Sequence, residues 1–128
     1  MICLDTNFII DFLKKKKEAV GFIEKCEEEV VTTEINSFEV FIGIYGKEDY
    51  GNKSISARGF FDSIKILSGN QWGEEAAKIL ADLIKEGKII EVNDCLMISI
   101  MKANGCNRIV TNNRKHFERI KNIEIISY

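Results

Sequence analysis

The chain alternates short aliphatic runs with longer stretches in which apolar residues recur at helical spacing. Short runs rich in β-branched and aliphatic residues predict strands at 1–4, 30–33, 64–67, 108–111 and 123–126. Helical spacing between them predicts helices at 8–13, 18–29, 35–45, 54–62, 74–86, 94–102 and 113–119. Short apolar strands separated by helices are typical of a mostly parallel sheet covered on both faces. We therefore expect an α/β protein built as a three-layer α/β/α sandwich.

The segment 35–45 is apolar at nearly every position. Such a pattern predicts a deeply buried helix, with no surplus face that could be assigned to an interface. The polar, glycine-punctuated segment that follows it, 46–52, reads as a loop. We assign no role to the charged residues between 46 and 58.

Composition limits the class of protein further. The chain has 128 residues, 45% of them hydrophobic and 30% charged, with a formal net charge of −2. These values fit one ordered domain, residues 1–128, and no apolar run approaches the roughly 20 residues of a membrane span. Its first five residues carry no basic leader, so no signal peptide is expected. Four cysteines without a Cys-x-x-Cys pair and a single histidine argue against a zinc site and for reduced, partly buried thiols in the cytoplasm.

Charge is unevenly distributed along the chain. Residues 1–99 sum to −6, whereas residues 100–128 sum to +4. A basic segment on an otherwise acidic protein indicates a surface for a polyanion, with Arg108, Arg114 and Lys115 as candidate contacts to a phosphodiester backbone. The lysine run at 14–17 is more simply a solvated face.

Three carboxylates interrupt the hydrophobic pattern. Asp5 directly follows the first strand, where it could cap the next helix. Glu39 lies within the apolar helix 35–45, with no Lys or Arg within one turn, and Asp94 opens the apolar helix that follows Asn93. A buried carboxylate without a partner is costly, so Glu39 in particular predicts a function or a distant partner. Helix-dipole stabilisation explains Asp94 equally well.

A fourth candidate segment is Thr111-Asn112-Asn113, which follows the strand predicted at 108–111. It offers a hydroxyl and two amides, although such residues also serve as turns and helix caps. Parallel sheets place their sites beyond the carboxyl ends of the strands, where Asp5, Glu39, Asp94 and Asn113 could meet. Converging carboxylates repel one another, and a hard divalent cation relieves that repulsion. Oxygen donors favour Mg²⁺ or Mn²⁺, which could activate water for attack on a phosphodiester.

The sequence resembles the PIN-domain family and, within it, the VapC-type toxins of toxin–antitoxin pairs. This resemblance runs nearly from end to end, and its motifs are specific together rather than singly. The motifs that carry it are Leu4-Asp5-Thr6-Asn7, Glu39 four residues before Gly43, Asn93-Asp94, and Val110-Thr111-Asn112-Asn113 followed by His116-Phe117.

The resemblance implies a metal-dependent ribonuclease with an α/β/α fold, a cognate antitoxin and a homodimer. Asp5, Glu39 and Asp94 match the acids of the family, and Asn113 matches a fourth position where many members have Asp. By the same comparison, Thr111 supports the acids, Asn7 matches a residue often found at the rim of the site, and Asn112 is a further supporting residue. We interpret Phe117 as core packing and His116 as structural rather than catalytic.

Three other functions compete with the nuclease. A catalytically silent PIN-like module that binds RNA or protein is favoured by the uncharged Asn113. A phospho-acceptor receiver domain needs an acceptor Asp after a central strand, and Asp49 follows Gly46-Lys47-Glu48, which is no strand. A dinucleotide-binding Rossmann domain lacks its glycine fingerprint after the first strand.

Overall fold

Five short parallel strands form one sheet at the centre of the protein. The computed structural model describes residues 1–70 and 72–128, in which the strands are ordered β3-β2-β1-β4-β5. Their bounds are β1 Ile2–Leu4, β2 Val30–Thr33, β3 Lys65–Leu67, β4 Arg108–Val110 and β5 Glu124–Ile126. All four pairings are parallel, as the separation of strands by helices predicts.

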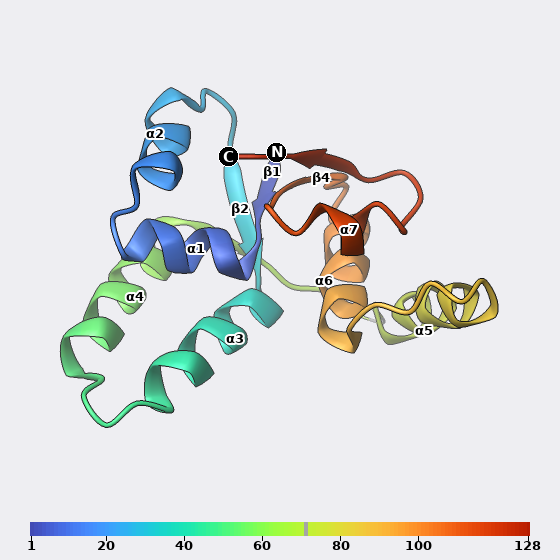
Figure 1. Ribbon diagram of the computed structural model, residues 1–128, viewed down its shortest axis with the longest axis horizontal. Coiled ribbons are helices and arrows are strands. Elements are labelled where there is room, and N and C mark those ends of the chain that lie inside the picture. Colours follow the sequence, from blue (N-terminus) through green and yellow to red (C-terminus); the bar gives the residue numbers. More distant parts are fainter. Residues whose placement is uncertain (71) are drawn as a thin grey trace.

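Helices cover both faces of the sheet, which confirms the three-layer α/β/α architecture (Figure 1). The helices are α1 Thr6–Leu13, α2 Lys17–Lys25, α3 Glu34–Tyr45, α4 Gly51–Ser63, α5 Trp72–Lys85, α6 Val92–Ala103 and α7 Arg114–Phe117. Each predicted helix and strand is present, and no end is shifted by more than four residues. The largest shift is in α2, which ends at Lys25 because Cys26 has extended backbone.

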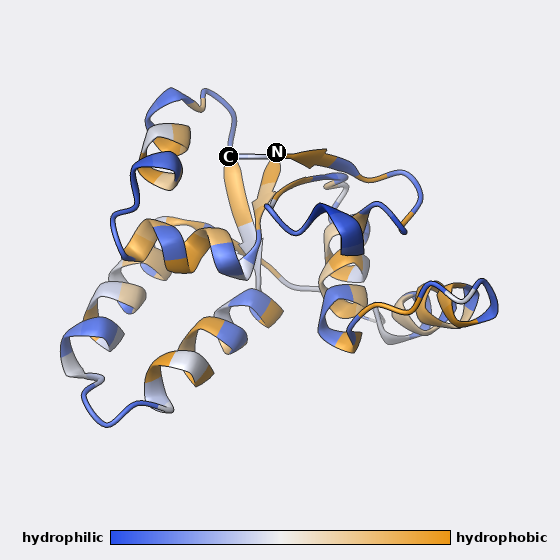
Figure 2. Ribbon diagram, in the orientation of Figure 1, coloured by the Kyte–Doolittle hydropathy of each residue, from blue (hydrophilic) through white to orange (hydrophobic). Residues whose placement is uncertain are grey.

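Alternate residues of each strand enter two separate hydrophobic cores, because successive side chains of a strand point to opposite faces. Cys3 and Ile109 pack with α5, α6 and Phe117 of α7. Leu4 and Val110 pack with α1 to α4 on the other face. Figure 2 shows that the central strands are hydrophobic and that α7 is hydrophilic.

All four cysteines are free, and Cys3, Cys95 and Cys106 are buried, in agreement with their predicted role as small core residues. No helix within the described residues is long and apolar enough to cross a bilayer.

The prediction that the helix at 35–45 is deeply buried is wrong. Only Asn36 and Val40 of α3 are buried, whereas Phe38 is 58% exposed, Ile42 59% and Tyr45 48%. The reason is that α3 starts at the end of β2 and runs past the sheet, so it packs on one side against α1, α4 and α6 (Figure 1). Phe38, Ile42 and Tyr45 are spaced i, i+4 and i+7, so they form one exposed apolar stripe, called here the α3 stripe.

Candidate active site

The candidate active site lies where the order of strand addition changes from one side of β1 to the other. From β1 the chain adds β2 and β3 on one side, then returns to place β4 and β5 on the other. The switch point therefore lies between the carboxyl ends of β1 and β4, which is where ligands bind in open parallel sheets. Asp5 follows β1 and Thr111 follows β4 at this point.

Asp5 is held rigidly by three hydrogen bonds. The Thr111 Oγ1 hydroxyl donates to Oδ2 of Asp5 over 2.7 Å, and the Thr6 amide donates to Oδ1 over 2.7 Å. The Asp5 amide donates to the carbonyl of Val110 on the neighbouring strand. Asp5 thus caps α1, and its carboxylate also accepts a hydrogen bond from Thr111 at the end of the neighbouring strand.

Glu39 reaches the same edge of the sheet from α3. Its Oε1 accepts a hydrogen bond of 2.7 Å from the Thr6 hydroxyl, and its Oε2 accepts one of 3.4 Å from the Asn93 side-chain amide. Both donors are neutral. They orient the Glu39 carboxylate without balancing its charge. The distant partners predicted for Glu39 are therefore neutral hydrogen-bond donors and not a basic residue.

Asn36 and Thr6 contact the candidate site, and the sequence analysis did not single them out. Asn36 is fully buried, forms a capping box with Thr33, and donates from Nδ2 to the Thr6 hydroxyl over 3.1 Å. Because the Thr6 hydroxyl in turn donates to Glu39, a hydrogen-bond relay fixes this carboxylate. A signal was available in the sequence, since Asn36 lies three residues before Glu39 on the same face of an apolar helix.

Asp94 lies in the first turn of α6, with only 16% of its side chain exposed. The Nδ1 atom of His116 is 3.4 Å from Oδ2 of Asp94 and 3.0 Å from Nδ2 of Asn113. The backbone amide of Asn113 also donates to the Thr111 hydroxyl over 3.0 Å. The structure therefore places His116, which the sequence analysis interprets as structural, directly against a candidate catalytic acid.

The pKa values of Asp5 and Asp94 are raised, so these two carboxyl groups resist ionisation. Burial raises the pKa of Asp5, and the charge of Glu39 adds to this effect, although the hydrogen bonds from Thr111 and Thr6 oppose it. Burial raises the pKa of Asp94 to about 6, with a further contribution from the charge of Asp5 and an opposing hydrogen bond from His116. The three acids therefore lie close enough to repel one another.

This donor set fits a hard divalent cation in its chemistry. It supplies carboxylate oxygens that a positive charge would stabilise, together with the amide of Asn113. Across residues 1–70 and 72–128, however, no three His, Cys, Asp or Glu side chains converge as one metal-binding group. In this arrangement Glu39 is engaged instead by Thr6 and Asn93.

Apart from Arg108, the predicted supporting and RNA-binding residues lie on α1, on α7 and in the turn after β4. Asn7 is exposed on the first turn of α1, and Lys115 is exposed on α7, next to Asn113. Arg114 is also exposed on α7, where it contacts Glu118 and Ser127. Asn112 is exposed and accepts a hydrogen bond from the Tyr128 amide, so it fastens the chain after β5.

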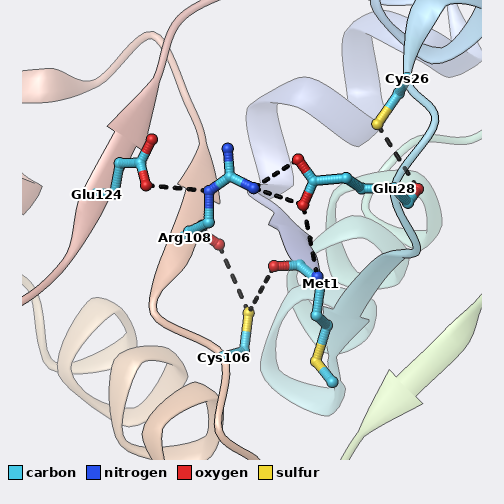
Figure 3. A network of polar contacts seen from close by, with 6 residues as sticks. All are labelled: Met1, Cys26, Glu28, Cys106, Arg108 and Glu124. Carbon is cyan, nitrogen blue, oxygen red and sulfur yellow. Dashed lines mark hydrogen bonds and ion pairs between the residues drawn. The ribbon is translucent and has the colours of Figure 1, made fainter.

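The structure does not bring Arg108 to the site. Arg108 begins β4, at the opposite end of the sheet, where its Nη1 is 2.6 Å from Glu28 Oε1 and its Nε is 3.0 Å from Glu124 (Figure 3). The Arg108 guanidinium lowers the pKa of Glu28, whose carboxylate also lies 3.7 Å from the amino group of Met1. This cluster joins the amino ends of neighbouring strands. Arg108 is in the basic segment of the sequence but is separated from it in space.

Comparison with known proteins identifies the family. The family model described as PIN domain matches residues 2–123, and the chain belongs to this family. No curated protein is similar enough in sequence to count as a match.

Solved structures with the same fold include components of toxin–antitoxin complexes. A chain of VapBC2 from Rickettsia felis, bound to a promoter DNA fragment, is 22% identical with a TM-score of 0.89, covering 100% of this chain and 99% of that chain. A chain of DNA-bound VapBC from Salmonella typhimurium is 25% identical with a TM-score of 0.85, covering 98% and 96%. VapC20 of Mycobacterium tuberculosis, a toxin that cleaves the sarcin-ricin loop, is 10% identical with a TM-score of 0.68, covering 97% and 99%.

Proposed function

We propose that the protein is a metal-dependent endoribonuclease of the cytoplasm and the toxin of a type II toxin–antitoxin pair. The observation that carries this proposal is the electrostatic coupling of Asp5, Glu39 and Asp94 at the switch point of the sheet, where burial and the neighbouring acids raise the pKa values of Asp5 and Asp94. Membership of the PIN domain family and the likeness to VapBC chains support it.

In this proposal Asp5, Glu39, Asp94 and Asn113 hold Mg²⁺ or Mn²⁺. When bound, the cation would supply Lewis acidity to the phosphodiester and to the attacking water. Thr111 and the Thr6 amide fix the carboxylate of Asp5, and the Asn36–Thr6 relay orients Glu39. These contacts keep the charged oxygens in place before substrate arrives, which is the main contribution a protein makes to such a site.

The exposed side chains of Arg114 and Lys115 follow Asn113 directly, on α7. We place the RNA backbone there, because phosphate contacts from Arg and Lys dominate affinity for nucleic acids. Their position beside the acids would bring the scissile phosphodiester to the carboxyl edge of the sheet.

The decisive experiment is cleavage of a mixed RNA pool by purified protein with Mn²⁺ or Mg²⁺. We compare the wild type with Asp5→Asn, with a chelator-treated sample, and with Asp82→Asn, which alters an exposed acid of α5. The proposal expects cleavage by the wild type and Asp82→Asn only. Cleavage by Asp5→Asn or in chelator would contradict it.

The cleavage experiment also tests the alternative of a catalytically silent PIN-like module, which the uncharged Asn113 favours. Absence of cleavage by wild-type protein, together with absence of metal binding in calorimetry, would select that alternative. Metal binding without cleavage would instead indicate a narrow RNA target.

The antitoxin has a candidate binding surface on the α1–α3–α4 side of the protein. A groove of about 510 Å³ is lined there by the apolar side chains Ile10, Leu13, Val40 and Ile44 and by Lys14, Lys47 and Lys53. An apolar groove with three lysines fits an amphipathic acidic segment, which we propose the antitoxin supplies.

Gly43 allows a direct test, because it lines the groove and nothing lies within 4 Å of a Cβ built there. Gly43→Trp should fill the groove and abolish complex formation with the co-expressed product of the adjacent gene. Gly73→Trp is a matched control, since Gly73 on α5 is equally open. Equal binding by both variants would exclude this groove.

The homodimer has a different candidate surface, the α3 stripe. Exposed aliphatic and aromatic residues in one row are unusual on a monomer and suit contact with a second copy. We propose that the α3 stripe is the dimer interface.

A further inference from the structure

His116 touches Asp94 and Asn113, two of the residues in the proposed metal site. We propose that His116 is itself a ligand of the cation, through Nδ1, and that it makes the site selective for Mn²⁺ over Mg²⁺. This inference rests on the proposed function, because it concerns the same cation.

The distances around Nδ1 fit ligands that share an ion as well as they fit hydrogen bonds. Nδ1 is 3.4 Å from Oδ2 of Asp94, a long distance for a hydrogen bond between nitrogen and oxygen. Adjacent donors of an octahedral ion, each about 2.1 Å from it, lie about 3 Å apart. The spacing between Nδ1 and Asp94 Oδ2 approaches this value.

Asn113 supplies the third donor. Its terminal amide atom is 3.0 Å from Nδ1 of His116, again close to the spacing of adjacent ligands. The oxygen and nitrogen of such an amide are exchanged by a half-turn of the side chain, so Oδ1 can occupy this position. Asp94, Asn113 and His116 therefore present one oxygen, one amide and one imidazole nitrogen within a small space.

The ring of His116 is held in place and remains accessible. The adjacent Phe117 is buried in the core, and the Asn113 amide at the start of α7 is bonded to Thr111. The His116 side chain is 34% exposed, so an ion can reach it from solvent. The same Thr111 hydroxyl bonds Asp5, so the segment that carries His116 is joined to Asp5 through Asn113 and Thr111.

An imidazole ligand changes which ion the site prefers. Mg²⁺ is a hard ion that binds almost entirely through oxygen, whereas the first-row transition ions accept nitrogen readily. Replacing one oxygen by Nδ1 should therefore favour Mn²⁺ at this site.

Direct ligation can be measured on tag-free wild-type protein, because the chain contains one histidine. Electron spin echo envelope modulation of the Mn²⁺-loaded protein should show nitrogen coupling from a ligated imidazole. Calorimetry should show that His116→Gln lowers Mn²⁺ affinity at least 10-fold and Mg²⁺ affinity by a smaller factor. Lys115→Gln, which alters the preceding residue of α7, should leave the ratio of the two affinities unchanged.

The outcomes separate this inference from the proposed function. Bound Mn²⁺ without nitrogen coupling, or an unchanged Mn²⁺ to Mg²⁺ ratio in a folded His116→Gln, would overturn the role of His116 while RNA cleavage persists. If the wild-type protein neither binds Mn²⁺ nor cleaves RNA, the proposed function is overturned as well.

Discussion

The hydroxyl of Thr111 donates to the carboxylate of Asp5 over 2.7 Å, and both residues are buried at the ends of the two central strands. Thr111→Val keeps the shape of the side chain and removes the donor, so we expect the free energy of unfolding to fall by about 2 kcal/mol and RNA cleavage to weaken. Chemical unfolding and a cleavage assay measure the two effects. Thr111→Ser retains the hydroxyl and should preserve most of the activity; equal loss in Ser and Val variants would contradict a role for this bond.

Glu39→Gln tests the carboxylate that the Asn36–Thr6 relay orients. Glutamine keeps the size of the side chain but loses its charge, so cleavage should fall at least about 100-fold while the protein remains folded. Single-turnover cleavage and thermal unfolding are the measurements. A variant with unchanged cleavage would show that Glu39 serves only to hold Thr6 and Asn93 in place.

Asp94 predicts an unusual pH dependence of stability in metal-free protein. Its pKa is raised from 3.8 to about 6 in the folded state, so the folded protein holds this proton more tightly than the unfolded chain does. Stability from this group is therefore lost as the pH rises from about 4 to about 6, by up to about 3 kcal/mol.

Asp94→Asn cannot ionise at this position and should escape that loss. Denaturant unfolding of both proteins in chelator, at several pH values between 4 and 7, gives the comparison. The variant should gain stability relative to the wild type as the pH rises. Parallel pH profiles would show that the folded state does not disfavour ionisation of Asp94.

We expect different roles for two basic residues, because Arg108 begins β4 at the amino end of the sheet and Lys115 lies on α7, beyond its carboxyl end. Lys115→Ala should weaken RNA binding and reduce the salt dependence by about one counterion, measured in an Asp5→Asn background that prevents cleavage. Arg108→Ala should leave RNA affinity unchanged but lower stability, because Arg108 pairs with Glu28 and Glu124 at the far end of the sheet. An equal loss of affinity in both variants would place RNA across both ends.

The α3 stripe predicts a change in oligomeric state. Ile42→Asp should convert a dimer into a monomer, as measured by light scattering after size-exclusion chromatography. Ile89→Asp is a matched control, because Ile89 is 61% exposed and Ile42 is 59% exposed. If Ile42→Asp remains dimeric, the α3 stripe is not the interface.

Local patterns were sufficient to predict the order of the elements. Gly87 and Gly105, for example, follow α5 and α6 with positive φ, as their positions in the sequence indicate. The burial of α3 was not predictable in the same way. An apolar sequence shows that a helix can be buried, but it does not show which of its faces other elements cover. Phe38 and Val40 are both apolar and lie two positions apart, yet the first is 58% exposed and the second 2%.

The candidate site shows a similar division. Asp5 and Thr111 could be placed because each follows a strand, and strand ends in a parallel sheet share one edge. The contacts of His116 with Asp94 and of Asn36 with Thr6 join residues that are 22 and 30 positions apart. Such contacts depend on how α7 lies against α6 and how α3 lies against α1, and no local spacing encodes those packings.

The sheet is electrostatically satisfied at its amino end and frustrated at its carboxyl end. Arg108 and the amino group of Met1 pair with Glu28 and Glu124, whereas Asp5 and Asp94 are buried among like charges. A selection for thermal stability alone would therefore accumulate neutral residues at positions 5 and 94, and the stabilised variants would be inactive. Enrichment of neutral residues at these two positions would show that the trade-off between stability and activity arises at the carboxyl edge of the sheet.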